Sequence, residues 1–330
     1  MKRYLWIFAV LPFLWSCIAE DRSACPQPRG VSVRMSVCPD PMTAVTHAAD
    51  EEAIRDLNLY LLDADRNVVL HRYQSSPTLR FECLPGDYLL RIAANMGRDT
   101  GDSPAWENLA VTHADDYDTL PMAYEGEVSI PSSDETVTLP TVEVQRVVAK
   151  VTYNISVAPD AGDIRLHSVQ PVNLPARMPV FDPGLRAAEY TAGEIVGSSS
   201  QTLTGTFYML PNLQGEVPSI ADQRDKGPAN APADATFLRI RALRGSKVLD
   251  YYIYPGGNNT SNFDIRANTH YRLDIMIRGD AEVDDADAQH CAQKQADRIP
   301  SRGPAFPPDQ QAEDNKNCRR RQQKPHLRQK

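Results

Sequence analysis

Residues 147–157 read Val147-Val148-Ala149-Lys150-Val151-Thr152-Tyr153-Asn154-Ile155-Ser156-Val157. Every odd position in this stretch is apolar, and most even positions are polar. Alternation with a period of two is typical of a β-strand that buries one face and leaves the other in water. We therefore predict a long strand from Arg146 to Val157 with its odd-numbered residues in a core.

The same alternation recurs on both sides of this stretch. Apolar residues occupy every second position in 31–37, 57–61 and 271–277. Turn-forming residues separate the apolar runs, and Asp63–Asn67 predicts a hairpin between two of them. Only Ser103–Ala114, with three apolar side chains on one side, favours a helix. Many short strands with turns between them predict β-sandwiches or barrels rather than alternating strands and helices.

The length of 330 residues suggests about two domains. The roughly thirteen strand candidates between residues 31 and 279 fit two sandwiches better than one. We place the boundary near Gln145, where the preceding strand candidate ends. The predicted organisation is a signal peptide at 1–16, a linker at 17–30, an N-terminal β-sandwich at 31–145, a C-terminal β-sandwich at 146–280 and a tail at 281–330.

The tail differs in composition from the rest of the chain. It contains only four large apolar residues, Val283, Ile299, Phe306 and Leu327, among many charged ones. Such a segment buries too little apolar surface to offset the entropy lost on ordering. We predict that residues 281–330 are disordered, and a shifted reading frame at the end of the gene is an alternative explanation of the abrupt change.

The first residues predict export and a lipid anchor. Lys2 and Arg3 precede an apolar stretch of about twelve residues, which is the length of a signal-peptide core and too short to span a bilayer. The stretch ends in Leu14-Trp15-Ser16-Cys17, which resembles the lipobox of bacterial lipoproteins apart from the bulky Trp15. The resemblance implies lipid modification of Cys17, while an ordinary cleaved signal is the alternative. The following Ala19-Glu20-Asp21 resembles the surface-export signal of Bacteroidetes lipoproteins.

The other cysteines and the charge restrict the class of protein further. An exported chain can form disulfides, and one pair among Cys25, Cys38 and Cys83 is plausible, although their connectivity stays open. Cys291 and Cys318 lie in the tail. The net charge of −8 argues against a nucleic-acid partner.

Motifs for catalysis are absent from the sequence. It contains no G-x-S-x-G, P-loop or G-x-G-x-x-G pattern, and no histidine spacing of a metal site. The acidic cluster 115–118 lacks the spacing and the glycine of an EF-hand loop. We interpret His113 and His270 as surface or strand-edge residues. We expect no enzymatic activity, no cofactor and no metal site.

Several stretches together resemble the fimbrillin superfamily of Bacteroidales, which comprises type V pilins and their lipoprotein anchor subunits. The matching stretches, in chain order, are Cys17–Pro26, Ile54–Asp63, the Pro-Gly-x-Tyr hairpin at Leu84–Asn95, the Pro-Met turn at Leu120–Met122, the Arg-x-x-Ala-Lys strand at Val144–Thr152 and the Arg-Asn-x-x-Tyr strand at Arg266–Tyr271. The tail departs from the family, whose members continue in strand-like sequence.

The resemblance implies an all-β fold of two tandem transthyretin-like Greek-key β-sandwiches. It implies fimbrial subunits as partners, attachment to the outer membrane through a lipid on Cys17, and assembly by strand exchange. In this family a protease cuts the pilin after an arginine and removes the first strand, whereas an anchor stays uncut. Arg29 is the candidate processing site in this sequence, since it precedes Gly30 and the strand 31–37.

The Cys25-Pro26 pair favours the anchoring branch of the minor fimbrium over a polymerising or tip pilin. A surface lipoprotein that binds a glycan or another ligand is the alternative of a different class. In that case Trp106, or the group Tyr251, Tyr252 and Tyr254, would form an aromatic platform, although Tyr251 alternates with apolar neighbours and fits a core position better.

Overall fold

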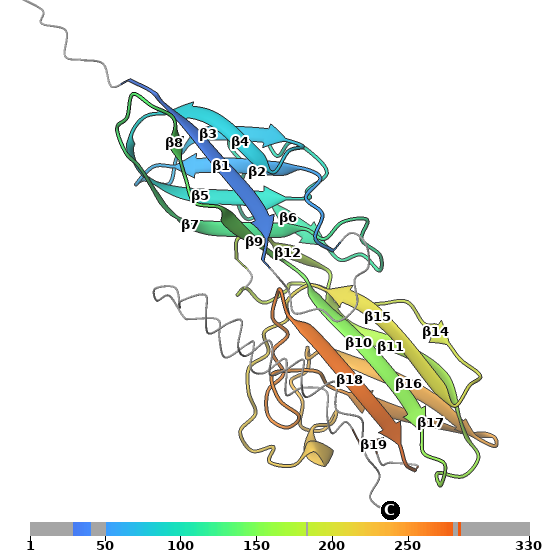
Figure 1. Cartoon of the computed structure of the whole chain (residues 1–330). Helices are drawn as coiled ribbons and strands as arrows, with labels where there is room; N and C mark the ends of the chain where they lie inside the picture. The colour runs from blue at the N-terminus through green and yellow to red at the C-terminus, as the bar shows by residue number, and fades with distance from the viewer. Residues whose placement is uncertain (1–28, 41–50, 183, 280–282, 285–330) are drawn as a thin grey trace, which may run out of the picture.

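The computed structural model describes residues 29–40, 51–182, 184–279 and 283–284 (Figure 1). The described chain is almost entirely β, which confirms the predicted fold class, and its helical content is one 3₁₀ turn, η1 (Gln223–Asp225). The described part of the chain includes no helix with the length and hydropathy needed to cross a membrane. The signal segment, Cys17, Cys25 and all but two residues of the tail lie outside the described residues.

The N-terminal half contains nine strands. They are β1 (Val31–Pro39), β2 (Leu57–Leu62), β3 (Val68–Gln74), β4 (Thr78–Cys83), β5 (Gly86–Ala94), β6 (Ala110–Thr112), β7 (Met122–Ile130), β8 (Val137–Thr138) and β9 (Val142–Arg146). Seven of them follow the order β3-β2-β5-β7-β9-β1-β4, and β8 pairs with β1. The alternate residues of β1, namely Val31, Val33, Met35 and Val37, pack with residues of β2 and β5 in one core.

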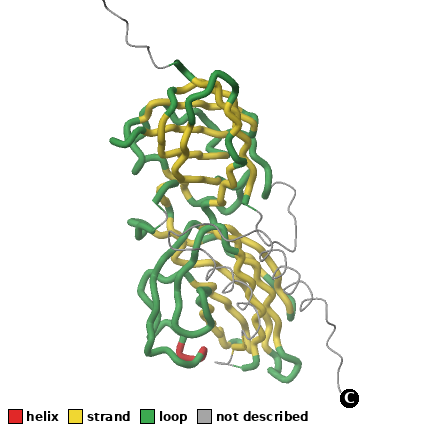
Figure 2. Tube along the Cα trace, turned by 60° about the vertical axis from the view of Figure 1, so that its left-hand side comes forward, coloured by secondary structure: helices red, strands yellow, loops and turns green. Residues whose placement is uncertain are grey.

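The C-terminal half contains the remaining strands. They are β10 (Ala149–Val157), β11 (Ile164–Pro175), β12 (Arg177–Pro179), β13 (Tyr190–Ala192), β14 (Val196–Gly197), β15 (Thr202–Met209), β16 (Phe237–Arg244), β17 (Lys247–Ile253), β18 (His270–Ile277) and β19 (Val283–Asp284). A sheet β15-β10-β18-β19 faces a sheet built around β13-β11-β16-β17. The odd residues of β10, from Val151 to Val157, lie in the core between them as the alternation predicts. Long loops that include η1 gather on one side (Figure 2).

Contacts between the two halves are extensive. The short strand β12 of the C-terminal half pairs with β6 of the N-terminal half, and Met178 packs against Leu109 and Val111. The Nζ atom of Lys150 lies 2.5 Å from Oε1 of Glu51, and the Tyr208 hydroxyl donates to the same oxygen at 2.6 Å. Buried apolar and charged contacts therefore join the halves.

Three details of the predicted strands are wrong. The strand expected from Arg146 begins at Ala149, because Arg146 ends β9 and its buried side chain donates to backbone carbonyls of the N-terminal half. The segment 103–114 forms a single turn at Ala105–Leu109 followed by β6, because Leu109 and Val111 are drawn into the contact with β12. The stretch 84–95 is no hairpin, since β4 pairs with β1 and β5 pairs with β2 and β7.

Candidate functional site

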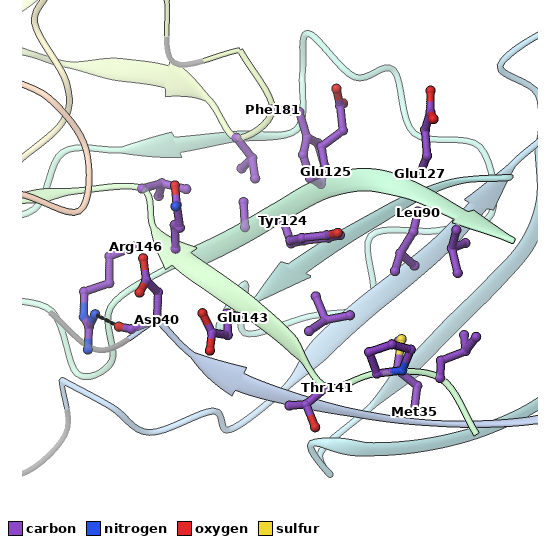
Figure 3. A pocket seen from close by; sticks show the side chains of 18 of the residues that line it. Met35, Asp40, Leu90, Tyr124, Glu125, Glu127, Thr141, Glu143, Arg146 and Phe181 are labelled. Carbon is purple, nitrogen blue, oxygen red and sulfur yellow. Dashed lines mark hydrogen bonds between the residues drawn. The ribbon is translucent and has the colours of Figure 1, made fainter. Parts of the chain in front are cut away.

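A groove of about 600 Å³ opens between β7 and β9, and Val180, Phe181 and Ala267 of the C-terminal half also line it (Figure 3). These strands pair at only two positions, Met122 with Arg146 and Ala123 with Gln145. Beyond those pairs the strands separate, and Figure 3 shows them converging beside Arg146 and diverging toward Thr141. The groove is therefore the gap left where two edges of the curved sheet fail to close.

A proline lies beside the gap. Strand β1 pairs in parallel with β8 (Val33 with Val137) and with β9 (Val37 with Val142), and the register shifts by one residue between the two stretches. Pro140 lies at this shift, in the connection between β8 and β9. Proline has no backbone N–H to donate to a sheet and is confined to edges and bulges. The interrupted segment forms part of one wall of the groove.

The floor of the groove is apolar. Met35 of β1 and Leu90 of β5 are core residues that line it, together with Val128 of β7 and Val142 of β9. Val128 and Val142 are only partly buried although they belong to the same core. The opening therefore reaches the interior of the N-terminal half.

The rim of the groove is acidic. Glu125 and Glu127 point outward from β7, and Glu143 points outward from β9. Glu125 is paired with Arg91 at 2.6 Å, whereas Glu127 and Glu143 have no ion-pair partner within the residues that the structure describes. Burial and the nearby Glu143 raise the pKa of Asp40 at the end of β1, despite the attraction of Arg146. The rim therefore carries a negative potential.

Arg146 closes the narrow end of the groove. Its side chain is 1% exposed and donates to the carbonyl of Asp40 at 2.8 Å, the carbonyl of Glu51 at 3.1 Å and Oδ1 of Asn268 at 3.3 Å. Asn268 in turn donates to Oδ2 of Asp40 at 2.8 Å. These bonds fix the end of β1 against the C-terminal half.

The structure separates the residues that the sequence singled out. Arg29 is exposed and lies two residues before the start of β1, so a cut after it would leave β1 in the downstream chain. Cys17 lies outside the described residues.

The two described cysteines lie at opposite ends of β1. Cys83 is opposite Val31 at one end of the strand, and Cys38 lies near the other end. Both thiols are free. This geometry excludes a Cys38–Cys83 disulfide.

Most rings of the aromatic platform that the ligand-binding alternative would need are buried or half-buried, and Tyr251 lies in the core as its alternation indicates. Trp106 is half-buried, with the Arg91 guanidinium 4.4 Å above its ring and Tyr60 packed edge-on against it. Tyr251 and Tyr254 are buried. These rings contribute to packing rather than to an exposed binding face.

The two histidines interpreted as surface or strand-edge residues lie at strand ends but not on the surface, since His113 directly follows β6 and His270 begins β18. The side chains of His113 and His270 are mostly buried, and burial lowers the pKa of both, that of His270 to about 4. Within the described residues, no group of three or more His, Cys, Asp or Glu is arranged to hold a metal ion.

Sequence reasoning missed the groove. Its residues come mainly from β1, β5, β7 and β9, with Val180, Phe181 and Ala267 from farther along the chain, and no one of these segments by itself indicates a groove. The one local signal is Pro140 between two short apolar stretches, which marks an interrupted strand.

Comparison with known proteins finds one matching sequence family and several solved structures with a similar fold. Residues 207–275 match a family described as a domain of unknown function (DUF4906), and no curated protein matches the chain by sequence. The fold is similar to the tip fimbrial protein Mfa3 from Porphyromonas gingivalis, truncated at its C-terminus, with 16% identity, 78% of this chain and 98% of that chain covered, and a TM-score of 0.56.

Two further solved structures share this fold. One is the fimbrilin FimA from Porphyromonas gingivalis W83, at 14% identity, with 76% of this chain and 91% of that chain covered and a TM-score of 0.53. The other is a protein from Bacteroides eggerthii with a proposed role in cell adhesion, at 14% identity, with 76% and 87% covered and a TM-score of 0.54. The expected resemblance to fimbrillins is confirmed at the level of the fold.

Proposed function

We propose that this protein is a structural, non-enzymatic subunit of a surface fimbrium and that it anchors the fimbrium to the outer membrane through a lipid on Cys17. The observation that carries the proposal is the shared fold with a tip fimbrial protein over 98% of that protein. The lipobox-like Leu14–Cys17 and the Cys25-Pro26 pair support the anchoring role.

The position of β1 supports an anchor that keeps its first strand. Six residues of β1 pair with β4, its other edge pairs with β8 and β9, and four of its side chains lie in the core. Release of β1 by proteolysis requires a cut between Pro39 and Leu57, where Arg55 is the only arginine or lysine. A cut at Arg29 removes the lipid and leaves β1 in place.

The N-terminus of the protein in assembled fimbriae distinguishes the roles. Mass spectrometry is expected to find a lipid-modified Cys17 as the first residue. An N-terminus at Gly30 or Asp56 would mean that the lipid has been removed, and a polymerising or tip subunit would then be the better assignment. An N-terminus at Asp56 would in addition mean that β1 has been released.

Deletion of the gene tests the anchoring role in cells. Fimbriae are expected to appear in the medium while pilin synthesis continues, because the polymer loses its lipid tether and keeps its other subunits. Complementation with wild-type protein should restore attachment, and complementation with Cys17→Ala should not. Fimbriae that stay attached and unchanged would favour a ligand-binding surface lipoprotein.

A further inference from the structure

One sheet of the C-terminal half concentrates positive charge. Strands β11, β16 and β17 lie side by side in it, and alternate residues of each strand pack in the core while the others face outward. The stretches 163–175 and 237–253, which contain these strands, hold five lysines and arginines and two aspartates, in a chain whose net charge is −8. This sheet is therefore positive although the whole chain is acidic.

Three arginines form a row on the outward face of this sheet. Arg239 and Arg241 are two residues apart on β16, and Arg165 of β11 is opposite Leu243, which is the next outward position on β16. Successive outward positions of a strand are about 7 Å apart, so the row extends over about 14 Å along the strands. A row of this length fits a linear polyanion, which carries charge along its length, better than a single small anion.

One carboxylate holds two of these guanidinium groups. Oδ1 of Asp250 on β17 accepts a hydrogen bond from Nε of Arg239 at 2.9 Å and another from Nε of Arg241 at 3.0 Å. The Nη groups of both arginines donate no hydrogen bond within the part of the chain that the structure describes. The two side chains are 33% and 43% exposed. An external oxyanion can therefore bind the Nη groups while the contacts to Asp250 keep both side chains in position.

Hydroxyl groups lie between the charges of this face. Ser168 of β11 is opposite Arg241, and Tyr252 of β17 is opposite Arg239. The ring of Tyr252 packs against Phe237, with 5.5 Å between the ring centroids. A hydroxyl can both donate and accept a hydrogen bond. Cations interspersed with hydroxyls match an acidic polysaccharide, which carries anionic groups and neutral hydroxyls along one chain, better than they match an acidic peptide.

We infer that this outward face binds a linear acidic polysaccharide, whose sulfate or carboxylate groups lie on Arg239, Arg241 and Arg165. A guanidinium group holds an oxyanion through two parallel N–H donors, which is a stronger and more directional contact than a point charge makes. The inference goes beyond the proposed function, from which it takes only the setting of a cell surface. It gives the C-terminal half a ligand whose binding is independent of how fimbrial subunits join.

Binding of defined polysaccharides to the purified full chain tests the inference. The probes are dextran sulfate, polygalacturonate and neutral dextran of matched length, and isothermal titration calorimetry measures their affinity. We expect at least one of the two acidic polymers to bind and neutral dextran not to bind. The acidic polymer that binds identifies sulfate or carboxylate as the group recognised. Binding of neither acidic polymer, or equal binding of neutral dextran, would overturn the inference.

Matched variants locate the binding site. Arg239→Gln/Arg241→Gln should weaken binding roughly tenfold or more, since it removes two charge-assisted contacts. The control Arg72→Gln/Arg80→Gln removes two exposed arginines from strands of the N-terminal half and should leave binding unchanged. Equal losses in these two variants would indicate attraction to net charge alone and overturn the inference.

A third variant separates guanidinium recognition from charge. Arg239→Lys/Arg241→Lys keeps both charges and removes the paired N–H donors, so binding should weaken about threefold or more. Unchanged binding in this variant would contradict the inference. Circular dichroism of each variant verifies that it is folded, which is expected because the substituted side chains lie on exposed faces of strands.

Two further measurements cover other occupants of this face. Polyglutamate represents an acidic protein, and tighter binding of it than of either acidic polysaccharide would identify a protein partner instead. Polysaccharide binding that appears only after removal of residues 285–330 would identify a segment of this chain as the occupant. Either result would overturn the inference. Because all these measurements use purified protein, their failure would leave the proposed fimbrial role untouched, and that role is tested separately by the release of fimbriae on gene deletion.

Discussion

Strands β1 and β10 hold equivalent positions in the two halves of the molecule, but they differ in the continuity of their pairing with the parallel neighbour. Each is the first strand of its half, with an antiparallel neighbour on one side and a parallel neighbour on the other. The parallel ladder of β10 with β18 is continuous over eight residues, from Lys150 to Val157. The parallel ladder of β1 is split between β8 and β9 by the bulge at Pro140.

The difference between the two parallel ladders shows which half of the molecule has a gap in its sheet. In the C-terminal half the described strands close over the core on both sides of β10, and Val151 and Ile155 are fully buried. In the N-terminal half a groove opens beside β9, and the core residue Met35 lines it. The interrupted parallel ladder and the open groove thus lie next to each other in this half.

The largest expected effect concerns the closed half. Val151→Asp places an unpaired charge in the core between the two sheets, and we expect a loss of more than about 4 kcal/mol in unfolding free energy, enough to unfold the C-terminal half. Denaturant unfolding followed by circular dichroism measures the change. Thr204→Asp, on the exposed face of β15, is the control and should cost little. Similar losses in both variants would contradict the pairing register of β10 with β15.

The next effect tests how far the halves depend on each other. Glu51→Ala leaves the Lys150 ammonium buried without its carboxylate, and loss of one partner of a buried pair costs about 3–5 kcal/mol. Calorimetry should show that the joint transition is lowered or divided into two. Glu51→Gln/Lys150→Met removes both charges and should recover most of the loss. A double variant as unstable as Glu51→Ala would show that the pair itself supplies the stability.

A smaller effect concerns the pH dependence of the unfolding free energy, to which a buried histidine of the C-terminal half contributes. His270 on β18 is buried beside Lys150 and Arg272, and burial together with these charges lowers its pKa from 6.5 to about 4. As pH falls through 6.5 the unfolded chain takes up a proton that the folded chain excludes, so stability declines until about pH 4, by up to roughly 3 kcal/mol. Unfolding at a series of pH values should show a shallower decline in His270→Gln. An unchanged profile in that variant would remove His270 as the cause.

The smallest effect compares β1 with β10 directly. The interrupted ladder of β1 lacks one or two hydrogen bonds, each worth about 1 kcal/mol. Backbone amides of Met35–Val37 should therefore exchange with solvent roughly tenfold faster than those of Val151–Tyr153. Hydrogen exchange read by mass spectrometry gives both values in one experiment. Equal protection of the two strands would show that the bulge leaves β1 as firmly held as β10.

Much of the fold follows from local patterns. The alternation at 31–37, 57–61 and 271–277 identifies three strands, and Asp63–Asn67 identifies the hairpin between β2 and β3. The predicted buried face is correct for β1 and β18, whereas β2 is buried on both faces. The errors arise where distant contacts override the local pattern. Leu109 and Val111 belong to a strand because β12 lies beside them, and no residue near them in sequence carries that information.

Side-chain alternation along the chain sufficed to establish the all-β class and the inward face of β1 and β18, because polar residues at alternate positions leave only one face to be buried. It did not reveal that β2 is buried on both faces, which depends on what packs over the sheet. Tertiary structure decided which strands lie next to one another, since pairing depends on contacts between residues more than a hundred positions apart, such as those of β1 with β9. It alone brought the glutamates of β7 and β9 to the two sides of one groove. The open edges there exist because two strand ends that pair at Met122 and Arg146 diverge, a property of sheet geometry rather than of either strand.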